Sequence, residues 1–245
     1  MSDSVDRLGP DDLLQITAQL AQAVHSGQRS QRVVEMLQRL DAMIQAVERP
    51  KRPASTQEQA ETIENVGAAW SNLGHAWGGM GMHEEALAAA QQACGWLRLA
   101  MPLGNQAREW FPAALNNLGG MLRALGRREV ALQATQEAVG LRRELHRTRP
   151  EAFAPNLALS LNNLGAMLSD LGRREEALLA TQEALGLYRE LHRTRPEAFA
   201  HDLAKSLNNL GGDLSALGRR EEALLATQEA VGLRRELHRT RPEAF

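Results

Sequence analysis

Leucines recur at steps of three and four along residues 157–171, which is the spacing of an amphipathic α-helix. Gly172 follows the last of them, as glycine often does just past a helix end. A second stretch with helical spacing begins near Arg174, and Pro196 stops it. No segment of the sequence alternates apolar and polar residues with period two. The pattern therefore predicts an all-α chain built from helix–turn–helix units.

The unit repeats along the chain. Residues 172–199 recur as 218–245 with 26 of 28 positions identical. The motif Leu-Asn-Asn-Leu-Gly begins at Leu115, Leu161 and Leu207, at a spacing of 46, and residues 71–74 are a diverged copy. A single helical hairpin cannot bury its leucine face, whereas stacked hairpins can. The repeat therefore predicts an α-solenoid.

The repeats leave a separate N-terminal region. Residues 1–48 carry two helical patterns without the repeat motif, and we interpret them as a helical hairpin that forms a cap or a degenerate repeat. A Pro- and Arg-containing linker is predicted at 49–57. The array then occupies 58–245, with repeats at about 67–111, 112–157, 158–203 and 204–245.

The amino-acid composition argues against several classes of function. The chain has 28 basic and 30 acidic residues and only 4% aromatics, which argues against a nucleic-acid-binding protein. Its one cysteine, Cys94, forms neither an internal disulfide nor a metal site. We see no apolar stretch of about 18 residues and no secretion signal, so we expect no membrane partner and a cytoplasmic location. The sequence shows no catalytic motif, so we expect no enzyme activity, cofactor or metal.

The repeat resembles the tetratricopeptide repeat family. The third copy fits that family's pattern through Leu161, Leu164, Gly165, Leu168, Gly172, Ala177 and Ala184. The period of 46, instead of about 34, resembles the kinesin-light-chain-type variant that is widespread in bacterial signalling proteins. The resemblance implies a right-handed superhelix whose first helices line a concave wall. We expect the additional residues to lengthen both helices and the loop between repeats.

The asparagines are the candidate binding residues. With the motif glycine counted as position eight, the sixth position is Asn72, Asn117, Asn163 and Asn209. The fifth position is Ser71, Asn116, Asn162 and Asn208. A primary amide has the donors and acceptors to pair with an extended peptide backbone. Peptide-binding members of the family commonly use an asparagine at the sixth position, so the resemblance implies the same role.

We therefore predict that the concave wall binds an extended peptide or partner segment. Its charged neighbours are Arg123, Asp170 and Lys205. A structural use of the asparagines stays open, because the same amides can tie adjacent first helices together or bond the preceding turn. Plain duplication is a third explanation of their recurrence.

The chain end, the paired arginines and a recurring glycine lead to three further predictions. The chain stops at Phe245 without a polar capping helix, so self-assembly into a homo-oligomer through that end is an alternative function. Paired arginines at the turns and repeat ends make phosphate or nucleic-acid binding along an arginine edge a weaker alternative. The second helix of each repeat contains a glycine in its middle. We predict that a helix of the next repeat approaches closely at this glycine. These glycines are Gly95, Gly140, Gly186 and Gly232.

Overall fold

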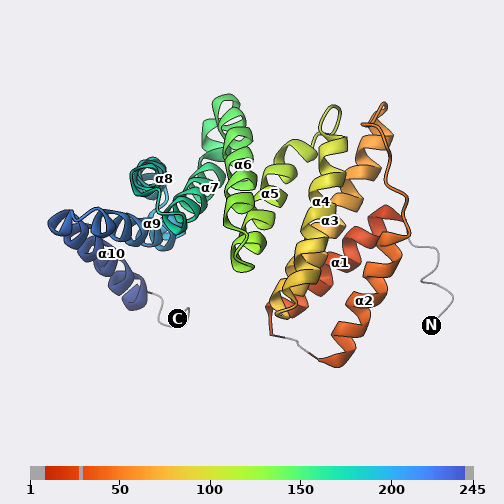
Figure 1. Ribbon diagram of the computed structural model, residues 1–245, viewed down its shortest axis with the longest axis horizontal. Helices are drawn as coiled ribbons and strands as arrows, with labels where there is room; N and C mark the ends of the chain where they lie inside the picture. The colour runs from red at the N-terminus through yellow and green to blue at the C-terminus, as the bar shows by residue number, and fades with distance from the viewer. Residues whose placement is uncertain (1–8, 28–29, 241–245) are drawn as a thin grey trace. The chain divides into compact units, whose positions relative to one another are not determined.

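The computed structural model describes residues 9–27 and 30–240, and in these ranges the regular structure is entirely α-helical (Figure 1). Phe245, on which the self-assembly prediction rests, lies outside the described residues. The helices are α1 (Pro10–His25), α2 (Gln31–Gln45), α3 (Gln57–Gly79), α4 (His83–Ala100), α5 (Ala107–Ala124), α6 (Arg128–Thr148), α7 (Pro150–Asp170), α8 (Arg174–Thr194), α9 (Pro196–Ala216) and α10 (Arg220–Thr240).

The chain forms two compact units, residues 1–127 and 128–245. The boundary falls in the turn between α5 and α6, within the second repeat. Residues 46–56 connect α2 to α3. The first unit contains α1 to α5 and the second contains α6 to α10.

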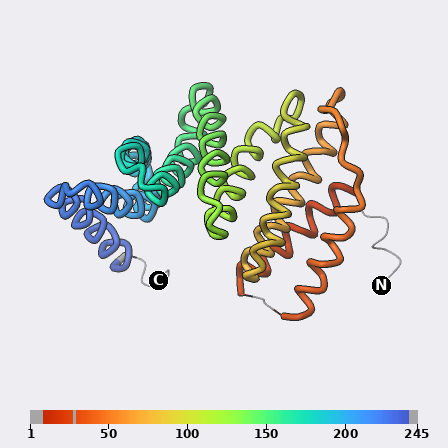
Figure 2. Tube along the Cα trace, viewed as in Figure 1, coloured from red at the N-terminus to blue at the C-terminus, as the bar shows by residue number. Residues whose placement is uncertain are grey.

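The lengths of the helices and turns in the second unit account for the repeat period of 46 residues. From α7 onward, a helix of 21 residues, a three-residue turn, a second helix of 21 residues and the single linking residue Arg195 complete one repeat. Gly172 in the turn has φ 74°, a left-handed conformation that suits glycine. Within this unit, α8 packs on its own first helix, α7, and on the first helix of the following repeat, α9 (Figure 2).

The start of each long first helix differs from the sequence prediction. We expected a lengthened loop between repeats, but Pro150 and Pro196 are the first residues of α7 and α9. Proline suits this position because its fixed φ is helical and its missing N–H would have no helical partner. Phe153 is buried beneath the Arg149 guanidinium, 4.7 Å from the ring centroid. The period is therefore longer because the helices are longer, not the loop.

Two sets of glycines have different surroundings. A Cβ on the motif glycine Gly165 would lie 3.4 Å from the Ala177 carbonyl oxygen and closer still to the Thr181 hydroxyl, so glycine lets the two helices of a hairpin approach. Gly140, Gly186 and Gly232 have open space where a Cβ would be, and the predicted close approach is wrong for them. At their counterpart in α4, Gly95, a Cβ would instead overlap the Arg49 side chain from the linker.

In the first unit, α1 lies along α3 and runs in the same direction. Asn65 of α3 donates to Asp11 near the start of α1, and further along both helices Asn72 donates to the Thr17 hydroxyl at 3.4 Å. The buried face of α1 consists of Leu13, Thr17, Leu20 and Val24. α1 thus covers one side of the first helix of the first repeat, although it has no repeat motif.

A buried carboxylate fixes the next repeat in the same unit. Glu64 of α3 is 2% exposed and accepts hydrogen bonds from the backbone N–H groups of Gln106 and Ala107, at 2.8 and 2.6 Å. These N–H groups open α5 and have no helical acceptor. A negative charge is also favourable at a helix N-terminus. Glu64 therefore joins α3 to the start of α5.

Candidate binding face on the first helices

The fifth-position asparagines lie inside the protein. Asn162 is 4% exposed, and its Oδ1 accepts a hydrogen bond from the Ser206 hydroxyl of α9 at 3.1 Å. Asn116 is also buried, at 8% exposed. The amide of Asn162 therefore ties two adjacent first helices together, which is the structural use left open by the sequence.

Asn208, the fifth-position residue of α9, is half-buried and faces α10. With its amide oxygen turned toward the Arg234 guanidinium, it accepts hydrogen bonds of 2.6 and 3.2 Å. No later first helix follows α9 in the described residues, so Asn208 bonds within its own hairpin instead of reaching the next repeat.

The sixth-position asparagines are different. Asn117, Asn163 and Asn209 are half-buried, and none of them makes a side-chain hydrogen bond within residues 9–27 and 30–240. Asn72, the counterpart in α3, donates to Thr17 of α1. Three of the four sixth-position amides therefore have no hydrogen-bond partner in the part of the chain that the structure describes.

In the second unit, the sixth-position asparagines lie on continuous partly exposed stripes. On α7 the stripe is Leu159, Asn163, Ala166 and Asp170, and on α9 it is Lys205, Asn209, Gly212 and Ala216. Steps of three and four place such residues on one side of a helix. Leu159 is 39% exposed, Lys205 is exposed and Asp170 is half-buried. Each stripe thus combines one amide with small residues and one charge.

Arg123 belongs to the first unit. It lies near the end of α5 and is exposed, six residues after Asn117 of the same helix. The structure therefore brings Asn163, Asn209, Asp170 and Lys205 together on the first helices of one unit, while Asn117 and Arg123 belong to α5 of the other.

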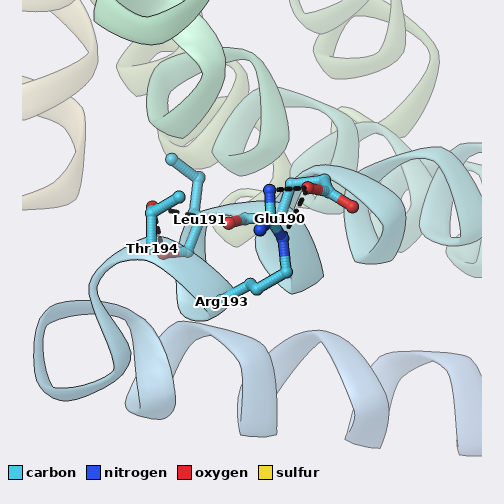
Figure 3. A network of polar contacts seen from close by, with 4 residues as sticks. All are labelled: Glu190, Leu191, Arg193 and Thr194. Carbon is cyan, nitrogen blue, oxygen red and sulfur yellow. Dashed lines mark hydrogen bonds and ion pairs between the residues drawn. The ribbon is translucent and has the colours of Figure 1, made fainter.

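Several members of the predicted arginine edge are paired with glutamates. Arg173 and Arg219 bond Glu176 and Glu222 of the same turn, each at 2.6 Å. At a repeat end, Arg193 bonds Glu190 at 3.2 Å, beside the hydrogen bond that Thr194 donates to the Leu191 carbonyl (Figure 3). These ion pairs reduce the net positive field that a phosphate would meet.

A buried polar seam between α6, α7, α8 and α9 escaped the sequence analysis. Arg142 of α6 is 5% exposed and donates to the Asn156 carbonyl of α7. Burial lowers the pKa of Arg142 to about 10, while the nearby Tyr188 acts in the opposite direction. Burial also raises the pKa of Tyr188, with the Asp202 charge adding to the increase. These residues vary between copies, so the repeat pattern gave no signal for them.

Asp213 of α9 belongs to the same seam. It is 6% exposed and accepts a hydrogen bond of 2.7 Å from the Thr181 hydroxyl of α8. Burial raises the pKa of the Asp213 carboxyl, and hydrogen bonds from Thr181 and Ser169 partly oppose this increase. The other first helices carry Ala76, Met121 or Met167 at this position, so the carboxylate is specific to the last interface.

Antiparallel hairpins of one repeated sequence, each packed on the next, define a helical-repeat protein of the α-solenoid class. Residues 113–147, 157–193 and 203–238 match the family model described as tetratricopeptide repeat. The chain belongs to the tetratricopeptide repeat family. No curated protein matches the sequence.

Solved structures share the fold at low sequence identity. BtubC (BKLC) from P. vanneervenii is 18% identical with a TM-score of 0.70, over 94% of this chain and 84% of that one. A protein from Podosopora anserina, described as a kinesin light chain with nearly identical TPR-like repeats, is 18% identical with a TM-score of 0.67, over 94% and 98%. The apo form of RapI is 13% identical with a TM-score of 0.67, over 91% and 70%.

None of the helices in residues 9–27 and 30–240 has the length and apolar character needed to cross a membrane. In the same part of the chain, no three metal-ligating side chains come together.

Proposed function

We propose that this chain is a non-catalytic scaffold for protein–protein interaction that holds an extended peptide or partner segment against its first helices. The proposal rests on one observation above the others. The sixth-position amides of Asn163 and Asn209 recur on neighbouring first helices and make no hydrogen bond within the described residues, while the fifth-position amide of Asn162 does. A cytoplasmic location remains a prediction from the sequence.

The chemistry of the two stripes supports a peptide as the ligand. An amide that is partly buried and unbonded is poorly solvated, so a backbone N–H or C=O that pairs with it gains a hydrogen bond in a partly dry site. Gly212 and Ala216 on α9, and Ala166 on α7, leave space for a main chain beside the amides. Lys205 and Asp170 add one charge of each sign, which can select side chains of opposite charge.

The test is peptide selection followed by calorimetry. A library of random peptides displayed on phage is selected on the whole chain, and the recovered peptides are titrated into the wild type and into Asn163→Ala/Asn209→Ala. We expect the double variant to bind about tenfold or more weakly, the loss expected for two hydrogen bonds at about 0.5–1.5 kcal/mol each. Its midpoint of thermal unfolding should remain within a few degrees of the wild type.

Asn162→Ala is the matched control. It removes the same side chain one residue away, and it leaves the Ser206 hydroxyl without its acceptor. We expect it to lower the thermal midpoint while each peptide binds the remaining folded protein with unchanged affinity. Equal affinity of the wild type and the double variant would contradict the proposal, as would failure to recover any peptide that saturates the wild type.

A further inference from the structure

The segment between α2 and α3 is held against the last turns of α4. The backbone N–H of Ala54 donates to the Leu99 carbonyl at 3.0 Å, and Ala54 is buried. One helical turn earlier on α4, the Arg49 side chain lies so close to Gly95 that a Cβ there would overlap the guanidinium. Two prolines between these anchors restrict the backbone further. The segment therefore follows α4 on a defined course from Gly95 to Leu99.

A hollow of about 1170 Å³ lies beside this segment and is also bounded by the start of α3 and by Trp96 of α4. Its floor is apolar, because the lining residues Ile63 and Trp96 are each 3% exposed. Its rim carries three exposed cations, Arg49, Lys51 and Arg52. We call this site the basic hollow.

The three cations of the basic hollow have no ion-pair partner in the part of the chain that the structure describes. Glu48 and Glu58 also border the hollow, yet neither forms an ion pair with them. Several arginines of the repeats, by contrast, each bond a glutamate at 2.5–2.8 Å. These are Arg143, Arg173, Arg189 and Arg219. The basic hollow thus differs from the arginine edge, because its cations are not neutralised by the chain's own carboxylates.

We propose that the basic hollow binds an acidic segment of a partner protein. Carboxylates of the segment pair with Lys51 and Arg52 through charge-assisted hydrogen bonds, and an apolar side chain beside them covers the floor. The site belongs to the first unit and lies apart from the asparagine stripes of α7 and α9. The proposal therefore stands independently of the proposed function.

An acidic protein segment fits the basic hollow better than a nucleic acid or a free phosphate does. A nucleic acid carries a charge on every nucleotide and would place some of them beside Glu48 and Glu58, whereas a peptide can place neutral residues there. The Trp96 ring is buried and offers no face on which a base could stack. A free phosphate makes no use of the apolar floor.

The test is fluorescence anisotropy with two labelled peptides titrated into the whole chain. One peptide has glutamates on both sides of a central leucine in a background of glycine and serine. The other has glutamine in place of each glutamate. We expect saturable binding of the acidic peptide at low ionic strength and at least about tenfold weaker binding of the glutamine peptide. Added salt should weaken binding of the acidic peptide, because it screens the ion pairs.

Lys51→Glu/Arg52→Glu should bind the acidic peptide at least about tenfold more weakly than the wild type, because two attractions become repulsions. Arg32→Glu/Arg39→Glu is the matched control. It makes the same change of net charge at two exposed arginines of α2 that do not border the hollow. We expect its affinity to lie within about twofold of the wild type. Lys51→Ala/Arg52→Ala, a milder change at exposed residues, should also weaken binding, and circular dichroism checks the fold of every variant.

Three results would overturn the proposal: equal binding of the two peptides, equal losses in Lys51→Glu/Arg52→Glu and the matched control, or no saturable binding to the wild type. Displacement of the acidic peptide by inorganic phosphate at constant ionic strength would assign the hollow to phosphate instead. Tighter binding of a labelled oligothymidylate, lost in Lys51→Glu/Arg52→Glu but not in the control, would assign it to nucleic acid. Either assignment would also overturn the proposal.

Discussion

Asn162 and Asn163 are identical side chains on adjacent residues, yet one is buried against Ser206 and the other faces a partly open surface. Each residue turns an α-helix by about 100°, so neighbours point in clearly different directions. Asn162 is therefore committed to the joint between α7 and α9, and Asn163 keeps its donors and acceptor. The two amides of the pair thus have different surroundings, although the repeat copies them together.

A second prediction at the scale of the residue concerns the effect of the buried Asp213 carboxyl on stability. Its pKa is raised in the folded state by burial, so ionisation of Asp213 near neutral pH disfavours folding. This penalty decreases once the pH falls below the folded pKa, and it is gone below the ordinary value of 3.8. Asp213→Asn keeps an oxygen that accepts from Thr181 but carries no charge. We expect it to raise the midpoint of thermal unfolding at pH 7 by roughly 2–4 °C, the shift that about 1 kcal/mol gives in a chain of this size.

The measurement is calorimetry of both proteins between pH 4 and 7. The gain from Asp213→Asn should shrink toward acidic pH, where the wild-type carboxyl is protonated and the two side chains become equivalent in charge. Glu221→Gln, at an exposed residue of α10, is the control and should change the midpoint little at any pH. A destabilised Asp213→Asn at pH 7 would show that the charge itself strengthens the α8–α9 joint.

At the scale of the element, the leucine stripe at 157–171 predicted the α7 helix and its end at Gly172, because burial of that stripe determines the helix. The helix starts were missed, since Pro196 was taken only as the stop of the preceding helix and is also the first residue of α9. The split between fifth- and sixth-position asparagines was not predictable either. Both positions lie off the leucine stripe, and only the placement of α9 decides that Asn162 is buried.

The glycines within the second helices carry a prediction about helix stability. Gly186 is exposed, and an added Cβ would meet no atom within 4 Å. Gly186→Ala should therefore raise the free energy of unfolding by about 1 kcal/mol, through helix propensity alone. Gly95→Ala is the contrast, because its Cβ overlaps the Arg49 side chain and the linker must shift.

Urea denaturation of the two variants tests this difference. We expect a clear gain for Gly186→Ala and a smaller gain, or a loss, for Gly95→Ala. A loss of stability at Gly186 would indicate that the glycine is needed for a contact that the open space beside it does not suggest.

At the scale of the whole molecule, stability in a repeat protein is close to a sum over repeats and nearest-neighbour interfaces. α8 has a later first helix packed against it, and α10 has none in the described residues. The two helices differ only at Leu185 and Val231 and at Tyr188 and Arg234. They therefore form an internal comparison in which sequence is nearly constant and packing differs.

Hydrogen exchange measured by mass spectrometry can make this comparison. We expect the backbone amides of residues 220–240 to exchange faster than those of residues 174–194, because the helix with one uncovered face opens more readily. Equal protection of the two helices in the free protein would contradict the nearest-neighbour account.

The single residue that links one 21-residue helix to the next affects how the gene can gain or lose repeats. Because a full period ends where the next helix starts, recombination between nearly identical coding segments adds or deletes a whole cassette of 46 codons and leaves every remaining junction intact. Such an exchange changes the length of the array without requiring any compensating substitution. The lineage can therefore alter the number of sixth-position amides in one genetic event, while each junction inherits a geometry that has already been selected.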